Sequence, residues 1–209
     1  MRFAIRFALA SVLLLGSFTS AAESETGTGT GTLVLDLKPF RSEVALKPKI
    51  ESQLKTGGIE WGLRDGQMVV TLLNKRFVDF DLNYMTRYGS TQTLQLPAGS
   101  YRLTTVGFEP HTGFNIDKVV AKGAYVNQDV LSFTVEPGKT TTMTMEPLIV
   151  DEERTLFVTF FIPTLFTTVA VEGSADTTAA PAEPVALNVR DERSISWPDY
   201  KGPLKFVAK

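Results

Sequence analysis

The side chains that could carry out chemistry are few in this chain and stand apart from one another. His111 is the only histidine, and the sequence contains no cysteine. No Gly-x-Ser-x-Gly or His-Glu-x-x-His pattern accompanies His111, so its surroundings support neither a nucleophilic triad nor a histidine-bound zinc ion. We therefore expect His111 to be an ordinary loop residue, and we predict no catalytic residue, no metal ligand and no bound cofactor.

Acidic and amide side chains alternate with apolar ones from Asp79 to Asn83, as the first ligands of a calcium loop do. An EF-hand loop needs glycine at its sixth position and glutamate at its twelfth, where this chain has Tyr84 and Ser90. The alternation is better explained as the solvent face of a strand.

Four aromatic residues are the candidate ligand-binding residues, because flat rings can stack on the apolar faces of sugars. They are Trp61, Tyr88, Trp197 and Tyr200. If these rings are exposed, they favour a carbohydrate-binding or carbohydrate-active accessory domain. If they are buried, they are core residues.

The charge pattern argues against a nucleic-acid partner. Acidic residues outnumber basic ones by 23 to 21, and no basic run is longer than Lys75-Arg76. Proteins that bind nucleic acids gather lysine and arginine into a patch that neutralises phosphates. Disulfides are excluded as well, so the fold depends on packing alone.

The N-terminus has the features of a cleavable signal peptide covering residues 1–22. Arg2 and Arg6 precede an apolar stretch, and small residues end at Ala22. A Thr-Gly-rich segment, residues 23–32, is expected to be a flexible leader. We therefore expect a periplasmic or secreted protein, with no membrane span in the mature chain.

Residues 33–209 are expected to form an antiparallel β-sandwich, because many short alternating segments are separated by Gly and Pro turns. Leu33 to Lys38 reads as a half-buried strand, Val78 to Tyr84 as another, and Glu51 to Lys55 as one helical turn. Two hairpins are predicted, one around Asp65-Gly66 and one around Glu136 to Lys139.

The sequence leaves open whether the last third of the chain belongs to the same sandwich. Residues 156–171 are apolar and rich in β-branched and aromatic side chains, which favours buried strands over a membrane helix. Residues 173–184 are predicted to be a mobile loop, and short strands are expected over 185–189 and 204–207. A boundary near residues 150–154 would make this third a separate unit.

Two motifs within residues 94–145 resemble a known family. They are Leu96-Pro97-Ala98-Gly99-Ser100-Tyr101-Arg102-Leu103, and Val135-Glu136-Pro137-Gly138-Lys139-Thr140. Together they resemble the turn motifs of bacterial transthyretin-like, carboxypeptidase-regulatory-like modules. The resemblance implies a small β-sandwich with an accessory role rather than catalysis, and it transfers no site residue.

The sequence thus favours an exported, non-enzymatic β-sandwich that binds a protein or an envelope component, including an envelope polysaccharide. The alternative is the carbohydrate-binding or carbohydrate-active domain. A third interpretation is an appendage subunit whose N-terminal strand, Leu33 to Lys38, would complete a neighbour's sheet. The oligomeric state is left open.

Overall fold

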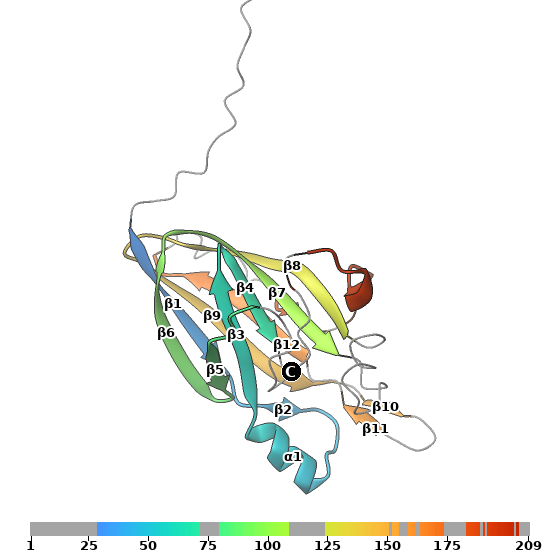
Figure 1. The fold of residues 1–209 in the computed structure, drawn as a ribbon. Coiled ribbons are helices and arrows are strands. Elements are labelled where there is room, and N and C mark those ends of the chain that lie inside the picture. Colours follow the sequence, from blue (N-terminus) through green and yellow to red (C-terminus); the bar gives the residue numbers. More distant parts are fainter. Residues whose placement is uncertain are drawn as a thin grey trace, which may run out of the picture.

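Two mixed β-sheets pack face to face in the computed structural model, which describes residues 29–71, 80–108, 124–150, 152–154, 159–161, 164–173, 183–188, 190, 192–202 and 204. The predicted all-β sandwich is confirmed (Figure 1). Its sheets are mixed rather than purely antiparallel as predicted, because strands that are distant in the chain pair in parallel. No helix among these residues is long and apolar enough to cross a membrane.

The first sheet, sheet I, has an N-terminal strand near its middle. Its order is β13 (Val185–Ala186), β12 (Thr164–Val171), β9 (Thr140–Ile149), β1 (Thr30–Leu37) and β6 (Ser90–Pro97), with β2 (Arg41–Ser42) beside β9. β1 runs antiparallel to β6 and parallel to β9. β12 and β13 follow residues 150–154 along the chain and pair in this sheet, so these two strands of the last third belong to the same sandwich.

The second sheet, sheet II, faces it. Its order is β14 (Ile195–Ser196), β8 (Ala124–Val135), β7 (Gly99–Phe108), β4 (Gln67–Thr71), β3 (Gly58–Arg64) and β5 (Tyr84–Arg87). The predicted hairpin around Asp65-Gly66 is confirmed as β3–β4. A separate two-stranded ladder pairs β10 (Glu152–Arg154) with β11 (Thr159–Phe161).

The space between the sheets holds the main core, which we call the inter-sheet core. Alternate residues of β1, namely Leu33, Leu35 and Leu37, are fully buried there, because successive side chains of a strand point to opposite faces. Trp61 and Leu103 meet them from sheet II.

A second apolar cluster lies on the other face of sheet II, and we call it the outer cluster. The C-terminal segment supplies Trp197, in the 3₁₀ helix η1 (Trp197–Asp199), together with Tyr200 and Leu204. Phe80 and Leu82 close it from the other side. This segment therefore covers part of the sheet that water would otherwise reach.

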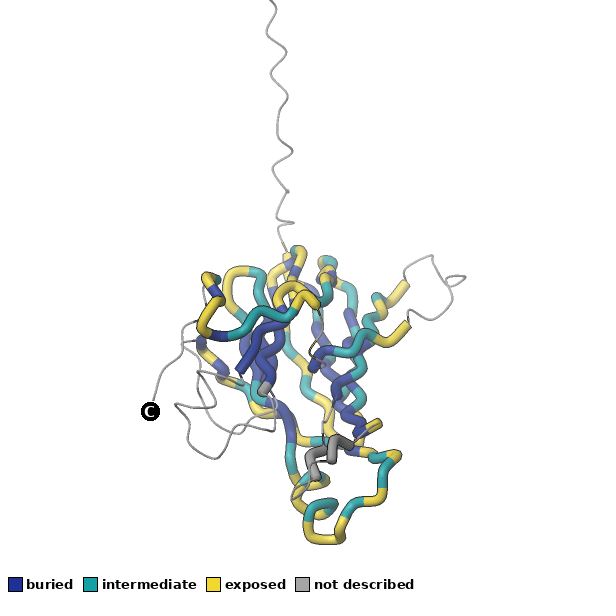
Figure 2. The backbone as a smooth tube through the Cα atoms, turned by 90° about the vertical axis from the view of Figure 1, so that its right-hand side faces the viewer, coloured by how far each residue is buried: buried dark blue, intermediate teal, exposed yellow. Residues whose placement is uncertain are grey.

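The helix α1 (Pro48–Lys55) contributes nothing to either core. It has no buried residue, and its end of the molecule is exposed or only partly buried (Figure 2). The helical turn expected at Glu51 to Lys55 is present as the end of α1. The helix begins at Pro48, and proline is favoured at the first position of a helix.

The predicted hairpin around Glu136 to Lys139 is wrong. β8 lies in sheet II and β9 in sheet I, so these residues carry the chain from one sheet to the other. Two adjacent strands with a tight Pro-Gly turn fit either arrangement. The outcome depends on long-range pairing of β9 with β1, which local sequence does not specify.

Two strand boundaries also differ from the prediction. β1 begins at Thr30, so the end of the expected leader already belongs to a strand. The strand expected from Val78 to Tyr84 begins only at Tyr84, since residues 80–83 are irregular. Val78, the loop at 174–182 and the side chains of residues 156–162 lie outside the described part.

The pairing of β1 argues against the interpretation as an appendage subunit. Leu33 to Leu37 already pairs on both sides within its own sheet, so this strand is not free to complete a neighbour's.

Candidate functional site

Three turns gather at one end of the sandwich and surround a groove of about 900 Å³, which we call the turn groove. They are the β3–β4 turn, the β6–β7 turn at residues 97–99 and the β8–β9 turn at residues 136–139. The last two each carry the chain from one sheet to the other, at the top of Figure 1. The groove therefore lies where both layers meet.

Positive backbone φ angles shape these turns. Asp65 and Gly66 have φ angles of 51° and 71°, as a two-residue hairpin turn requires, and Gly138 has 70°. The Arg102 N–H donates to the Gly66 carbonyl at 2.9 Å, which ties the β3–β4 turn to β7. The residues of these turns therefore determine the backbone shape of the groove's rim.

The start of β1 holds the β6–β7 and β8–β9 turns together. The Ala98 N–H donates to the Gly29 carbonyl at 2.8 Å, and the Gly138 N–H donates to the Thr30 carbonyl at 2.9 Å. A Cβ atom on Gly31 would lie 2.2 Å from the Glu136 carbonyl oxygen, so only glycine allows this approach. The Thr-Gly pattern predicted to be a flexible leader therefore serves here as a close-packed join.

The floor of the groove is apolar and closely packed. Leu63, Leu96, Tyr101 and Val135 line it. The Tyr101 ring stacks on Phe133 with centroids 5.4 Å apart, and its hydroxyl donates to the Pro97 carbonyl at 2.8 Å. A tyrosine hydroxyl is protonated at neutral pH, and burial raises the pKa of Tyr101 further.

The rim carries charges of both signs. Arg64 and Asp65 come from the β3–β4 turn, and Glu136 comes from the β8–β9 turn, where it pairs with Lys139. The Arg64 guanidinium also lies 4.5 Å from the centre of the Phe80 ring. An apolar floor inside a polar rim is the usual composition of a binding site.

The polar residues that line the groove include Arg64, Asp65, Ser100 and Glu136. Ser100 is the serine among its described lining residues, and no histidine, cysteine or lysine lies with it there to activate the hydroxyl. The described residues also contain no group of three or more His, Asp or Glu side chains placed to hold a metal ion.

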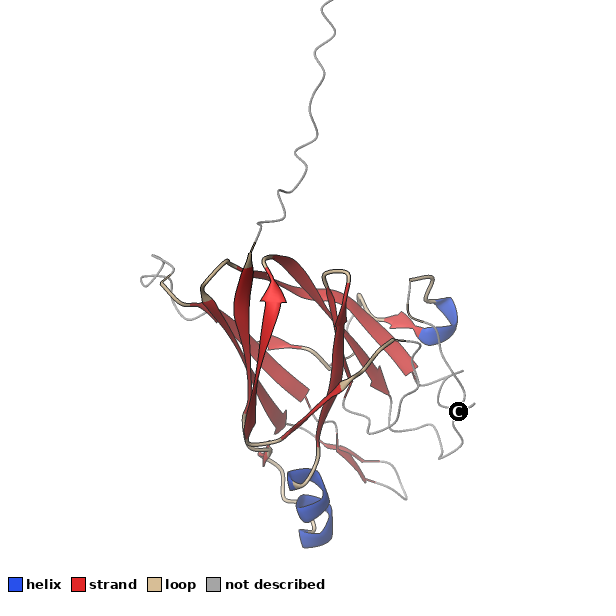
Figure 3. Ribbon diagram, turned by 60° about the vertical axis from the view of Figure 1, so that its left-hand side comes forward, coloured by secondary structure: helices blue, strands red, loops and turns tan. Residues whose placement is uncertain are grey.

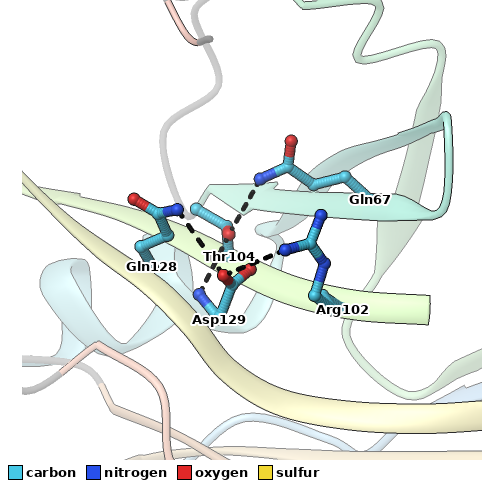
Figure 4. Close-up of polar contacts among 5 residues, drawn as sticks. All are labelled: Gln67, Arg102, Thr104, Gln128 and Asp129. Atoms are coloured by element: carbon cyan, nitrogen blue, oxygen red, sulfur yellow. Dashed lines mark hydrogen bonds and ion pairs between the residues drawn. The ribbon is translucent and has the colours of Figure 1, made fainter. Parts of the chain in front are cut away.

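A second polar cluster lies on the outer face of sheet II, at a bulge (Figure 4). Residues 128–130 of β8 face Thr104 of β7, and Asp129 has a φ of 49°. The Thr104 hydroxyl accepts from the Asp129 N–H at 3.2 Å and from Gln67 at 3.1 Å, while the Asp129 carboxylate accepts from Arg102 at 3.4 Å. These groups satisfy one another, so the cluster closes the bulge rather than offering free groups to a ligand.

Three of the four aromatic candidates are buried. Trp61 is 0% exposed, its indole N–H donates to the Thr86 hydroxyl at 2.9 Å, and its ring stacks on Tyr84. Trp197 is 9% exposed and Tyr200 is 8% exposed, and both pack in the outer cluster. None of these rings offers a face to a sugar.

Tyr88, the fourth candidate, is partly buried and packs against the inter-sheet core, whereas Trp197 and Tyr200 pack in the outer cluster. Its ring centre is 5.7 Å from that of Phe40, and burial raises its pKa to about 12. The four residues do not form one platform. His111 and Asp79 lie outside the described residues.

Sequence reasoning missed the turn groove as a site. Its signal was present, because Leu96 to Leu103 and Val135 to Thr140 were recognised as turn motifs. What local sequence did not show is that both turns connect the two sheets at the same end. Searches for similarity found no matching family model, no matching curated protein and no matching solved structure.

Proposed function

We propose that this chain is an exported, non-enzymatic β-sandwich module that binds a partner protein in the turn groove. The observation that carries the proposal is the groove itself, about 900 Å³ in volume, with an apolar floor and a rim of mixed charge. The resemblance of residues 94–145 to accessory transthyretin-like modules supports a binding role.

The ligand that fits this composition is an extended polypeptide segment. An aliphatic or aromatic side chain would contact Leu63, which is partly buried, and the remaining exposed edges of Leu96 and Tyr101. Charged neighbours along the segment would meet Arg64 and Glu136. A carbohydrate ligand is the weaker candidate, because Trp61, Trp197 and Tyr200 are buried and Tyr101 is stacked on Phe133.

Selection of peptides from a random library on the purified protein tests the proposal. We expect the selected peptides to share an apolar residue flanked by charges. Ser100 is exposed and lines the groove, so Ser100→Trp fills it with little effect on folding. Peptide affinity should fall at least tenfold in this variant, measured by calorimetry.

The matched control is Thr144→Trp, on the outer face of sheet I, which should leave peptide affinity unchanged. Equal binding to Ser100→Trp and to the unmodified protein would overturn the groove assignment. Oligosaccharide fragments of the envelope serve as the competing probe. Their binding, blocked by Ser100→Trp, would replace a protein partner by a carbohydrate one.

Export is tested separately. The signal peptide predicts a mature protein that begins at or within a few residues of Glu23. N-terminal sequencing of the protein from the periplasm and the medium checks this, and recovery of intact Met1 in those fractions would contradict it.

A further inference from the structure

In the part of the chain that the structure describes, the four outer edges of the two sheets differ sharply in length. β13 and β14 have two residues each and β5 has four, whereas β6 has eight. An edge strand presents unpaired N–H and C=O groups, and proteins usually keep such edges short or guard them with charges, prolines or bulges. β6 is the long edge of this sandwich, and Figure 3 turns its side of the molecule toward the viewer.

β6 lacks these guards over most of its length. Its sequence, Ser-Thr-Gln-Thr-Leu-Gln-Leu-Pro, contains no charge, and proline stands only at its last position. Its register with β1 runs without a bulge from Ser90 to Pro97. The strand is therefore regular enough to pair along its free side.

The backbone groups that face outward can be assigned from one hydrogen bond. The Ala98 N–H donates to Gly29, which continues the β1–β6 register, so Ala98 and Gly29 form a hydrogen-bonded pair. Such pairs recur at every second residue of an antiparallel ladder. Leu94 and Leu96 therefore bond to β1, while the N–H and C=O groups of Thr91, Thr93 and Gln95 point away from it.

Side chains leave this edge open. Thr91 donates to Asp36 at 3.4 Å, and Gln95 donates to Thr32 at 2.9 Å, so both side chains lean back over β1. Thr91, Thr93 and Gln95 are exposed. Among the described residues, no other strand pairs with this side of β6.

We propose that β6 pairs with β6 of a second copy of this chain, antiparallel, about a twofold axis at Thr93. Thr93 then exchanges both backbone hydrogen bonds with its own counterpart, and Thr91 does so with Gln95 of the other copy. The sandwiches join into a dimer with one sheet continuous across both.

The composition of β6 favours a second copy of this chain as the source of the strand that pairs with it. In this register threonine lies opposite threonine, Thr91 opposite Gln95, and Gln92 opposite Leu94, so no like charges meet. The chain as a whole is acidic, with a formal net charge of −2, and two copies approach each other best along an uncharged strip. The self-complementary register is what a twofold interface requires.

Disulfide trapping tests the register, since the chain has no cysteine of its own. Across the axis, Thr93→Cys places two Cα atoms about 5.5 Å apart, within reach of a disulfide. Thr91→Cys, the matched control, faces Gln95 and lies too far from its own copy. We expect Thr93→Cys to form a covalent dimer under mild oxidation at least tenfold faster than Thr91→Cys. Equal rates would overturn the register.

Charge complementation tests the interface without covalent chemistry. Light scattering at about 100 μM should show a dimer for the unmodified protein and monomers for Thr93→Lys and for Thr93→Glu, because like charges then oppose each other. Mixing the two variants should restore a dimer. A monomeric unmodified protein, or a dimer that persists in Thr93→Lys, would overturn the proposal.

Two controls make these outcomes specific. Thr93 is exposed on an edge, so the urea unfolding midpoint of both variants should match that of the unmodified protein. Ser100→Trp, which fills the turn groove, should leave the dimer intact. Failure of groove binding and failure of dimerisation are therefore distinguishable.

Discussion

The inter-sheet core and the outer cluster are built on the two faces of the same sheet, yet they differ in how they are closed. Paired strands from two sheets enclose the inter-sheet core, in which Leu33, Leu35 and Leu37 are fully buried. A short strand, a 3₁₀ helix and irregular backbone enclose the outer cluster. The first is part of the fold, whereas the second is a cover added to it.

This contrast indicates which contacts the stability of the fold depends on. Among the described residues, β14 pairs with β8 through only Ile195 and Ser196, so few backbone hydrogen bonds hold the cover in place. Segments with few such bonds open locally before the whole protein unfolds. Substitutions in the two regions should therefore differ in kind as well as in size.

The largest expected effect is that of Leu35→Ala in the inter-sheet core. Removing a fully buried leucine side chain leaves a cavity and should lower the free energy of unfolding by about 3 kcal/mol. Urea unfolding measures it. Val34→Ala, on the solvent face of the same strand, should cost under about 1 kcal/mol, and equal losses would contradict the assignment of faces.

Trp197→Ala should cost less, about 1–2 kcal/mol, although it removes a larger side chain, because the cover can detach alone. Hydrogen exchange should accelerate at residues 195–200 and stay unchanged in β1. The exposed neighbour Pro198 provides the control, and Pro198→Ala should change neither. Equal acceleration in β1 would show that the two regions unfold as one.

Alkaline pH should separate the regions again. The pKa of Tyr88, which packs against the inter-sheet core, is raised by burial to about 12, and burial also raises the pKa of Tyr200 in the outer cluster. A raised pKa means that the folded state holds the proton more tightly, so its stabilising effect is complete below pH 10 and is lost as pH rises toward 12.

We expect Tyr88→Phe to reduce this alkaline loss by on the order of 1 kcal/mol, and Tyr200→Phe to reduce it by less. Urea unfolding at pH 9 and pH 11.5 measures both. An unchanged pH dependence in Tyr88→Phe would contradict the burial of its hydroxyl.

The smallest expected effect concerns the link between the turn groove and the outer cluster. Arg64→Ala removes the guanidinium that lies over Phe80 and should cost about 0.5 kcal/mol. Arg64→Lys keeps a cation and should cost less. A thermal melt resolves the series, and a loss of several kcal/mol would mean that Arg64 holds more than this ring.

The fold class was predictable because strand alternation and turn chemistry are local properties. Asp65-Gly66 specified the β3–β4 hairpin, since both residues adopt positive φ. The same local signal at Gly138 did not reveal whether β9 folds back on β8 or crosses to the other sheet. Sheet membership depends on partners distant in sequence, as in the parallel pairing of β9 with β1.

The candidate site was less predictable for a related reason. Trp61 and Trp197 are candidate ligand-binding residues on the basis of residue type alone. The same apolar surface that suits a sugar also favours burial, and both side chains are buried. The turn groove is formed by residues from three separate turns that chemistry alone does not single out. Leu96 and Val135 reach the same end of the sandwich because the β6–β7 and β8–β9 turns both cross between the sheets there.

The central position of β1 has a kinetic consequence. Residues 30–37 pair with residues 90–97 on one side, and residues 32–37 pair with residues 140–145 on the other. Contacts so distant along the chain make folding slow, because long loops must close before any strand gains its partners. Sheet I cannot assemble until β9 has emerged from the ribosome, so β1 lacks one of its two partner strands, and stays open to proteases and chaperones, while most of the chain is made. A chain cut after Val135 should accordingly fail to fold, which limited proteolysis would show.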